Sequence, residues 1–182
     1  MRSHRAASVV IGLGNVALTD DGIGMHAVDR LCTRYELPAG VEAVKGGTSG
    51  LLLLPLIADA NRAIMIDAID TGAPPGTLLR LEGEAVGSAF AGALTPHDVG
   101  LTDLLAAARL TGYWPGLLVI LGVQPACVDV GTDLSPPVGA VLDALVAAIA
   151  AELEEWGVSM QRSRRTERAE ARAPGAWPSG GA

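Results

Sequence analysis

Three short runs of aliphatic residues constrain the fold more than any other feature of this sequence. They occupy residues 8–13, 63–66 and 117–122. In each run apolar side chains fill successive positions, which is typical of a strand that is buried on both faces. The segments between the runs carry apolar residues at helical spacing. Strands that alternate with helices predict an α/β three-layer sandwich, with a mostly parallel twisted sheet and helices on both faces.

The pattern between these runs predicts the remaining elements. Further strands are expected at 41–45 and 77–82, and helices at about 20–35, 51–60, 98–110 and 136–156. Thr19 or Asp20 is expected to cap the first helix, and Ser135 the last, with Pro136 as its first residue. In such folds ligands bind at the carboxyl ends of the strands. The loops after Leu13, after residue 66 and after residue 122 are therefore where a site is expected.

The length and charge of the chain suit one acidic domain. Residues 1–157 are expected to form a single α/β domain, and residues 158–182 a disordered tail rich in Arg, Pro and Gly. The net charge is −7, and the segment from 161 onward holds five Arg and two Glu, which leaves eight basic against 18 acidic residues elsewhere. An acidic body argues against nucleic acid as a partner. We expect a monomer.

Targeting signals and cysteines point to a cytoplasmic protein. The apolar run near the start is too short for a signal peptide and is interpreted as a strand. No apolar segment reaches the roughly 20 uninterrupted residues of a membrane span, so no membrane association is expected. Cys32 and Cys127 lie far apart and form no CxxC motif. They are predicted to be small core residues in a reducing compartment.

The turn after the first strand resembles a dinucleotide-binding loop. Gly12, Gly14 and Ala17 match the pattern G-x-G-x-x-A. In that fold the helix begins within the glycine motif and its N–H groups bind the pyrophosphate. Here four more residues intervene, and Asp20 and Asp21 stand where the helix begins, so they would repel a phosphate. The second strand also lacks a terminal acid for the ribose, and a dinucleotide-binding protein is therefore only a minor alternative.

Two carboxylates and one imidazole are expected at the same edge of the sheet. Asp21 follows the first strand, Asp67 ends the strand at 63–66, and His97 lies in the loop before a helix. Two oxygen ligands and one nitrogen ligand suit a borderline divalent cation, with positions left open for substrate or water.

Structural roles for the same residues remain open at this point. The two adjacent acids could cap a helix, and Asp67 could cap a turn with Ala68. His97 could be an ordinary loop residue that precedes an N-cap at Asp98. Spacing alone does not bring the three side chains together.

Five motifs taken together carry a family resemblance. They are GLGNVALTDDGIG, GGTSG, IDAID, TPHDVGL, and LGVQP followed by VGTDLSPPV. In order and spacing they resemble the hydrogenase maturation endopeptidases, over about residues 9–148. The resemblance implies a cytoplasmic endopeptidase that removes the C-terminal extension of the nickel-loaded [NiFe]-hydrogenase large-subunit precursor.

The resemblance also implies roles for particular residues. Asp21, Asp67 and His97 match the metal-binding and catalytic positions, and the nickel they bind is supplied by the precursor. The first position is Glu in some members and Asp here. Asp20 matches the Asp that precedes it in the motif, and we expect Asp20 to cap the helix. The metal would polarise the scissile carbonyl or lower the pKa of a bound water. A non-proteolytic module that checks nickel loading on a hydrogenase subunit remains the alternative.

The GGTSG loop and the end of the last long strand are predicted to contact substrate. Gly46, Gly47 and Thr48 would approach the substrate backbone, because glycine adopts φ values closed to other residues. Gln124 would line the cleft or form a structural turn. A covalent mechanism is disfavoured, since no G-x-S-x-G elbow is present and nothing places a histidine beside Cys127.

Overall fold

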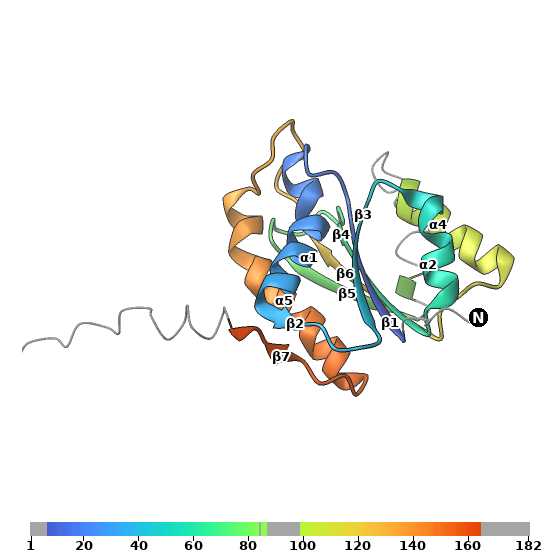
Figure 1. The fold of residues 1–182 in the computed structure, drawn as a ribbon. Helices are drawn as coiled ribbons and strands as arrows, with labels where there is room; N and C mark the ends of the chain where they lie inside the picture. The colour runs from blue at the N-terminus through green and yellow to red at the C-terminus, as the bar shows by residue number, and fades with distance from the viewer. Residues whose placement is uncertain (1–6, 84, 87–98, 165–182) are drawn as a thin grey trace, which may run out of the picture.

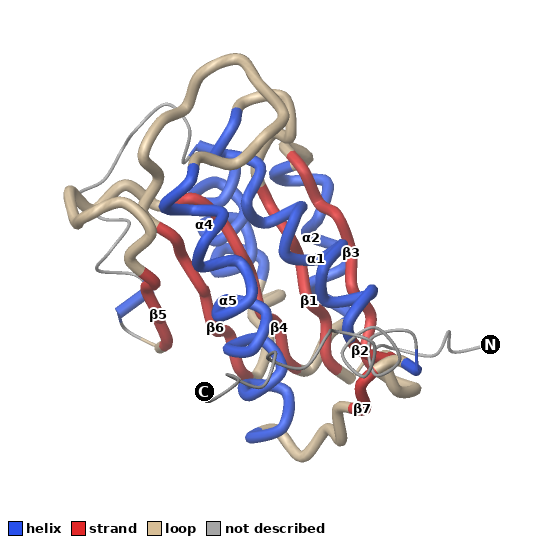
Figure 2. Tube along the Cα trace, turned by 90° about the vertical axis from the view of Figure 1, so that its left-hand side faces the viewer, coloured by secondary structure: helices blue, strands red, loops and turns tan. Residues whose placement is uncertain are grey.

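The computed structural model describes residues 7–83, 85–86 and 99–164, and its main feature is one five-stranded sheet (Figure 1). Across the sheet the strands are β3 (Val41–Gly47), β1 (Ser8–Leu13), β4 (Arg62–Ala68), β6 (Leu117–Val123) and β5 (Leu78–Glu82). Figure 2 shows this order, with β3 and β5 at the two edges. All pairings are parallel except that of β5 with β6. The predicted mostly parallel sheet is confirmed.

Helices cover both faces of the sheet. Helices α1 (Ile23–Arg34) and α5 (Pro136–Glu155) lie on one face, and α2 (Leu54–Asp59) and α4 (Val99–Thr111) lie on the other (Figure 1). Successive residues of β1 supply both cores, because side chains alternate across a strand. Val9 and Ile11 pack on the α2 and α4 side, and Val10 packs on the α1 and α5 side. The three-layer arrangement is therefore also confirmed.

The first two helices begin differently from the prediction. A 3-10 turn, η1 (Thr19–Gly22), precedes α1, whose N-cap is Gly22 without a side-chain cap. The expected capping of this helix by Thr19 or Asp20 is therefore wrong. A second 3-10 turn, η2 (Gly50–Leu53), precedes α2, and Pro55 lies in the first turn of α2, where a missing N–H costs little.

Close glycine contacts hold α1 against the sheet. A Cβ on Gly12 would lie 2.2 Å from the Gly24 carbonyl oxygen, and a Cβ on Gly24 would lie 2.4 Å from the Ile66 oxygen. The start of α1 is thus held at the carboxyl ends of β1 and β4. The glycine that suggested a nucleotide loop serves helix packing instead.

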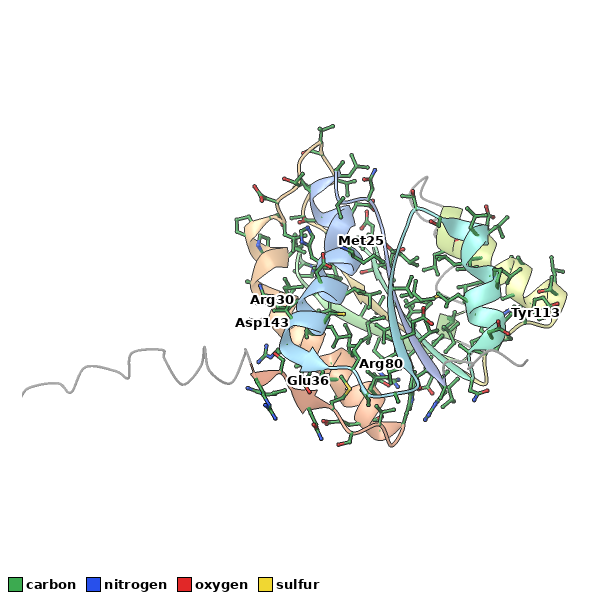
Figure 3. All side chains as sticks on the ribbon, viewed as in Figure 1. Met25, Arg30, Glu36, Arg80, Tyr113 and Asp143 are labelled. Atoms are coloured by element: carbon green, nitrogen blue, oxygen red, sulfur yellow. The ribbon has the colours of Figure 1, made fainter. Side chains whose placement is uncertain are left out.

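Helix α5 is apolar along its length. By length and composition it could cross a membrane, but its side chains form part of a core. Leu145, Val146 and Ile149 are buried among residues of α1, β4 and β6. On the outside, Arg30 of α1 and Asp143 of α5 form an exposed ion pair of 2.9 Å, and both are labelled in Figure 3.

The predicted tail begins too early. Gln161–Arg162 (β7) pairs with Tyr35–Glu36 (β2) in a small antiparallel sheet, and Val158 and Met160 pack against the α1 and α5 core. The fold therefore includes residues 158–164, although the local composition lacks an apolar period. Residues 165–182 lie outside the described part of the chain.

The two cysteines do not occupy the core positions predicted for them. Cys32 is exposed on α1, Cys127 is half-buried in the loop after β6, and neither forms a disulfide. Position in the chain alone did not reveal this, because cysteine is tolerated both in cores and on surfaces.

Candidate functional site

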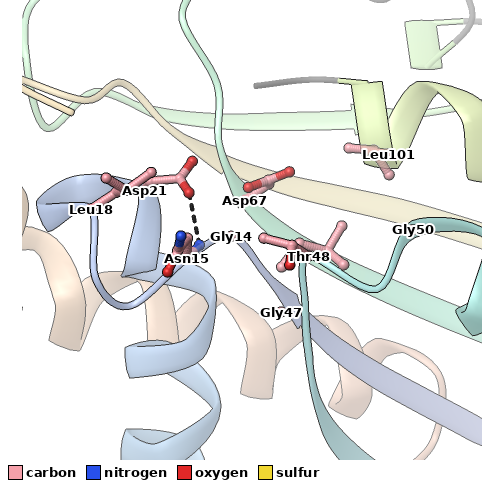
Figure 4. A pocket seen from close by; sticks show the side chains of 10 residues that line it. Gly14, Asn15, Leu18, Asp21, Gly47, Thr48, Gly50, Asp67 and Leu101 are labelled. Carbon is pink, nitrogen blue, oxygen red and sulfur yellow. Dashed lines mark hydrogen bonds between the residues drawn. The ribbon is translucent and has the colours of Figure 1, made fainter. Parts of the chain in front are cut away.

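A pocket of about 230 Å³ lies at the carboxyl ends of β1, β3 and β4. Loops from both sides of the sheet meet there with the start of α4 (Figure 4). Polar and apolar residues both contribute to its wall. The lining residues are Leu13, Gly14, Asn15, Leu18, Asp21, Gly47, Thr48, Gly50, Asp67 and Leu101.

Asp21 and Asp67 bring two carboxylates to this pocket. Asp21, in η1, is 8% exposed, and its Oδ2 accepts the backbone N–H of Asn15 at 2.7 Å. Asp67, near the end of β4, is 7% exposed, and its Oδ1 accepts the N–H of Ala68 at 2.9 Å. Both carboxylates face the same space in Figure 4. The turn contact of Asp67 with Ala68 therefore exists, and it is compatible with a place in the pocket.

Gly14 allows the two acids to approach each other. Its φ is +100°, and a Cβ there would lie 1.7 Å from the Asp21 carbonyl oxygen. The same Cβ would lie 3.6 Å from Oδ1 of Asp67. The position requires glycine for both its backbone angle and its space.

The loop after β3 forms another wall of the pocket. Gly47 has a φ of +57°, and its carbonyl accepts the N–H of Gly14 at 3.2 Å. Thr48 is exposed at the pocket, as the predicted substrate-binding role requires. Gly46 does not line the pocket, since its α-carbon packs among the side chains of Ile11 and Leu53.

Gln124 takes part in a loop anchor and does not line the pocket. It is 7% exposed, and its Oε1 accepts the Thr71 N–H at 2.7 Å and the Thr71 hydroxyl at 3.0 Å. Its Nε2 donates to Oδ1 of Asp70 at 2.9 Å. This bond, together with the Gly72 N–H, lowers the pKa of Asp70. Of the two predicted roles for Gln124, the geometry fits the structural turn.

The third predicted ligand, His97, lies outside the described residues. Within residues 7–83, 85–86 and 99–164, no group of three His, Cys, Asp or Glu side chains is close enough to hold a metal ion. The structure thus brings together Asp21 and Asp67, and the place of His97 stays a prediction.

Asp20 has a role that the sequence analysis missed. It is 0% exposed, and its carboxylate accepts hydrogen bonds from the loop after β6. The donors are the N–H groups of Ala126 (2.8 Å), Cys127 (3.1 Å) and Ser135 (2.7 Å) and the Ser135 hydroxyl (2.7 Å). Burial raises the pKa of Asp20, but these hydrogen bonds outweigh it and hold the pKa below its ordinary value.

Ser135, like Asp20, was expected to cap a helix and makes a different hydrogen bond instead. It occupies the N-cap position of α5 and Pro136 begins the helix, as predicted, but it makes no side-chain cap bond. Its hydroxyl instead donates to Asp20. No local motif signals a bond between residues 115 positions apart.

The arrangement suits a cation. An ionised carboxylate only accepts hydrogen bonds, and its oxygens bind metal ions. The loops at this end of the sheet, 14–22, 47–53, 68–77 and 123–135, contain no Lys or Arg. A divalent metal ion held by carboxylate oxygens fits this donor set.

Comparison with known proteins identifies the family. The family model for hydrogenase maturation protease (HycI) matches residues 25–152. The hydrogenase 2 maturation protease of Escherichia coli K12 is 39% identical over 151 residues, which are 82% of this chain and 92% of that protein. The chain belongs to the hydrogenase maturation proteases. Hydrogenase expression/formation protein HupD of Rhodobacter capsulatus is 38% identical over 157 residues, 85% of this protease and 74% of HupD.

Solved structures agree with this assignment. The hydrogenase maturating endopeptidase HybD from E. coli superposes with a TM-score of 0.80 at 38% identity, covering 85% of this protease and 96% of HybD. The [NiFe] hydrogenase maturation protease HybD from Thermococcus kodakarensis superposes with a TM-score of 0.62 at 25% identity, covering 80% and 97%. The predicted family and the prediction that the chain is a peptidase are confirmed.

Proposed function

We propose that this maturation protease removes the C-terminal extension of the nickel-containing [NiFe]-hydrogenase large-subunit precursor. In this proposal Asp21 and Asp67 bind the nickel that the precursor carries, and His97 is the third ligand. The observation that carries the proposal is the pair of buried carboxylates that face one pocket across Gly14.

The pocket offers a place for the peptide beside these acids. The loop of Gly47, Thr48 and Gly50 lies across the pocket from η1 (Figure 4). Gly47 and Gly50 have φ values of +57° and +47°, which favour glycine. Because glycine has no side chain, nothing at these two positions keeps a substrate backbone away. We assign the contact with the extended precursor segment to this loop.

The chemistry follows from where the carboxylates lie. A nickel ion held by them supplies a Lewis acid that polarises the scissile carbonyl or lowers the pKa of a bound water. Because the metal arrives with the substrate, cleavage occurs only on a loaded precursor. Asp21 and Asp67 thereby couple recognition of nickel to hydrolysis. A purely nickel-checking module is less well supported, since the family consists of proteases.

Processing of a purified precursor tests the proposal. The protease is incubated with nickel-loaded and nickel-free large subunit, and mass spectrometry follows loss of the C-terminal peptide. We expect cleavage of the loaded precursor alone, and none by Asp67→Asn or His97→Ala. Asp70→Asn is the matched control, because Asp70 lies just after Asp67 in the chain but does not line the pocket. Cleavage of the nickel-free precursor, or by Asp67→Asn, would contradict the proposal.

The setting of the reaction is also proposed. Two free cysteines are consistent with the reducing cytoplasm, where we place the protease. We expect a monomer that forms a transient complex with the precursor, which sedimentation of the free protease would check.

A further inference from the structure

We propose that Asp20 and Thr19 form a latch that positions Asp21 in the pocket. The latch joins η1 to residues 126–135, the loop that connects β6 with α5. Asp20 is thus a positioning residue, distinct from both a helix cap and a metal ligand. The consequence for nickel binding rests on the proposed function, whereas the positioning of Asp21 can be measured without a metal.

The carboxylate of Asp20 is saturated by hydrogen bonds from this loop. Oδ1 accepts the Ser135 N–H, and Oδ2 accepts the Ser135 hydroxyl and the N–H groups of Ala126 and Cys127. With 0% exposure and four such donors, Asp20 faces away from the pocket and has no place for a ligand. A buried charge is tolerated here because polar donors surround it.

Thr19 adds a strained backbone that the same loop holds. Its φ is +39°, the single positive value for a non-glycine residue among those described, and β-branched residues adopt it rarely. The Thr19 N–H donates to the Gly131 oxygen at 2.8 Å. Its hydroxyl donates to the Cys127 oxygen at 3.0 Å and accepts the Asp129 N–H at 3.1 Å. Such strain persists where surrounding contacts hold it, and it gathers at functional sites.

The latch determines where the next residue lies. Asp21 follows Asp20 directly, and its carboxylate accepts a hydrogen bond from the Asn15 N–H, within the same turn. The loop after β6 therefore reaches Asp21 through Asp20 and Thr19, and the Gly131 N–H also donates to the oxygen of Ala17, earlier in the same turn, at 2.9 Å. If the latch opens, Thr19 can return to an ordinary φ and η1 rotates. The Asp21 carboxylate then leaves its place opposite Asp67.

Asp20→Asn removes the latch with little change in size. Its amide nitrogen would meet an N–H donor at one of the two oxygen positions, so at least one bond becomes a clash of donors. Glu152→Gln is the matched control. Glu152 is also a buried carboxylate, 7% exposed, and it binds Arg80 between α5 and β5, away from the pocket. Both variants remove the charge of a buried, hydrogen-bonded carboxylate, and only one of them disturbs η1.

Two measurements on the full chain separate positioning from stability. Hydrogen exchange of the Asn15 amide reports its bond to Asp21 without any metal. We expect exchange at least tenfold faster in Asp20→Asn and unchanged in Glu152→Gln. The second readout is the affinity for nickel, measured by calorimetric titration with NiCl₂. We expect about tenfold weaker nickel binding in Asp20→Asn, because loss of a residue that orients a metal ligand typically lowers metal affinity by about that factor.

Each outcome decides between the alternatives. Unchanged Asn15 exchange and unchanged nickel affinity in Asp20→Asn would overturn the latch. If Asp20→Asn does not fold, two milder variants replace it: Ser135→Ala removes the hydroxyl bond to Asp20, and Thr19→Ala removes the two bonds of the Thr19 hydroxyl. Faster Asn15 exchange in both supports the proposal, whereas wild-type exchange in both overturns it. If the wild-type protein binds no nickel from solution, the exchange data alone decide the latch, and the proposed function is tested separately by processing of the nickel-loaded precursor.

Discussion

The backbone N–H of Asn15 donates to Oδ2 of Asp21 across 2.7 Å, so the glycine-rich turn after β1 binds a carboxylate of its own chain. In a nucleotide-binding fold, N–H groups of such a turn would contact a phosphate. Here they orient an acid whose other face is open to the pocket. This bond explains why the turn has the glycines of a phosphate loop together with a negative charge.

Asp21→Asn should stop processing without harm to the fold. The change keeps the size of the side chain, but it removes one anionic ligand of the nickel. We expect precursor cleavage to fall by about 100-fold or more, as loss of several kcal/mol of metal stabilisation implies. The temperature of thermal unfolding should be unchanged. Asp129→Asn, on a neighbouring exposed loop, should retain wild-type cleavage.

Gly14→Ala should destabilise the fold and abolish cleavage of the precursor. The new Cβ would lie 1.7 Å from the Asp21 oxygen, at a φ of +100°. We expect a cost of about 3 kcal/mol or more from backbone strain and overpacking, or a fall in Tm of at least about 6 °C. Gly72→Ala is the control, because Gly72 has a φ of +73° but nothing within 4 Å of an added Cβ. Equal losses in the two variants would show that the close contact is unimportant.

The bond between Gln124 and Asp70 should appear in the pH dependence of stability. Because the pKa of Asp70 is lowered in the folded state, this acid stabilises the protein above its unfolded pKa near 4. That contribution is lost as the pH falls through the lowered value. The gap in Tm between wild type and Asp70→Asn should therefore narrow below about pH 4. A gap that is constant from pH 7 to pH 3 would contradict the lowered pKa.

Leu52 should contribute to binding of the precursor. It is 83% exposed on η2, beside the pocket residue Gly50, where an exposed apolar side chain suits a protein partner. We expect Leu52→Ser to raise KM for the precursor several-fold, with kcat and Tm unchanged. Leu110 is a matched control at 88% exposure, about 13 Å further along α4 from the pocket residue Leu101. Leu110→Ser should leave KM as in wild type.

Local patterns in the chain were enough to predict the strands of the main sheet, its mostly parallel arrangement and the edge at which the two acids lie. Buried strands and amphipathic helices are encoded in local periodicity, so β1 was predicted to the residue and the other four strands of the five-stranded sheet to within two residues at either end. The short strands β2 and β7 were not predicted. Asp21 and Asp67 could be placed at one edge because parallel strands end together. The family motifs then pointed to their role.

The partners of the polar side chains depend on how distant loops come together in the fold. Asp20 binds Ser135, Gln124 binds Asp70, and the segment at 158–164 pairs with β2, none of which follows from spacing in the chain. These partners are set by the paths of loops, and hydrogen bonds between distant loops leave no periodic trace in the sequence. Asp20 and Asp21 are therefore identical residues with different roles in the fold, because Asp20 faces a loop rich in hydrogen-bond donors and Asp21 faces the pocket.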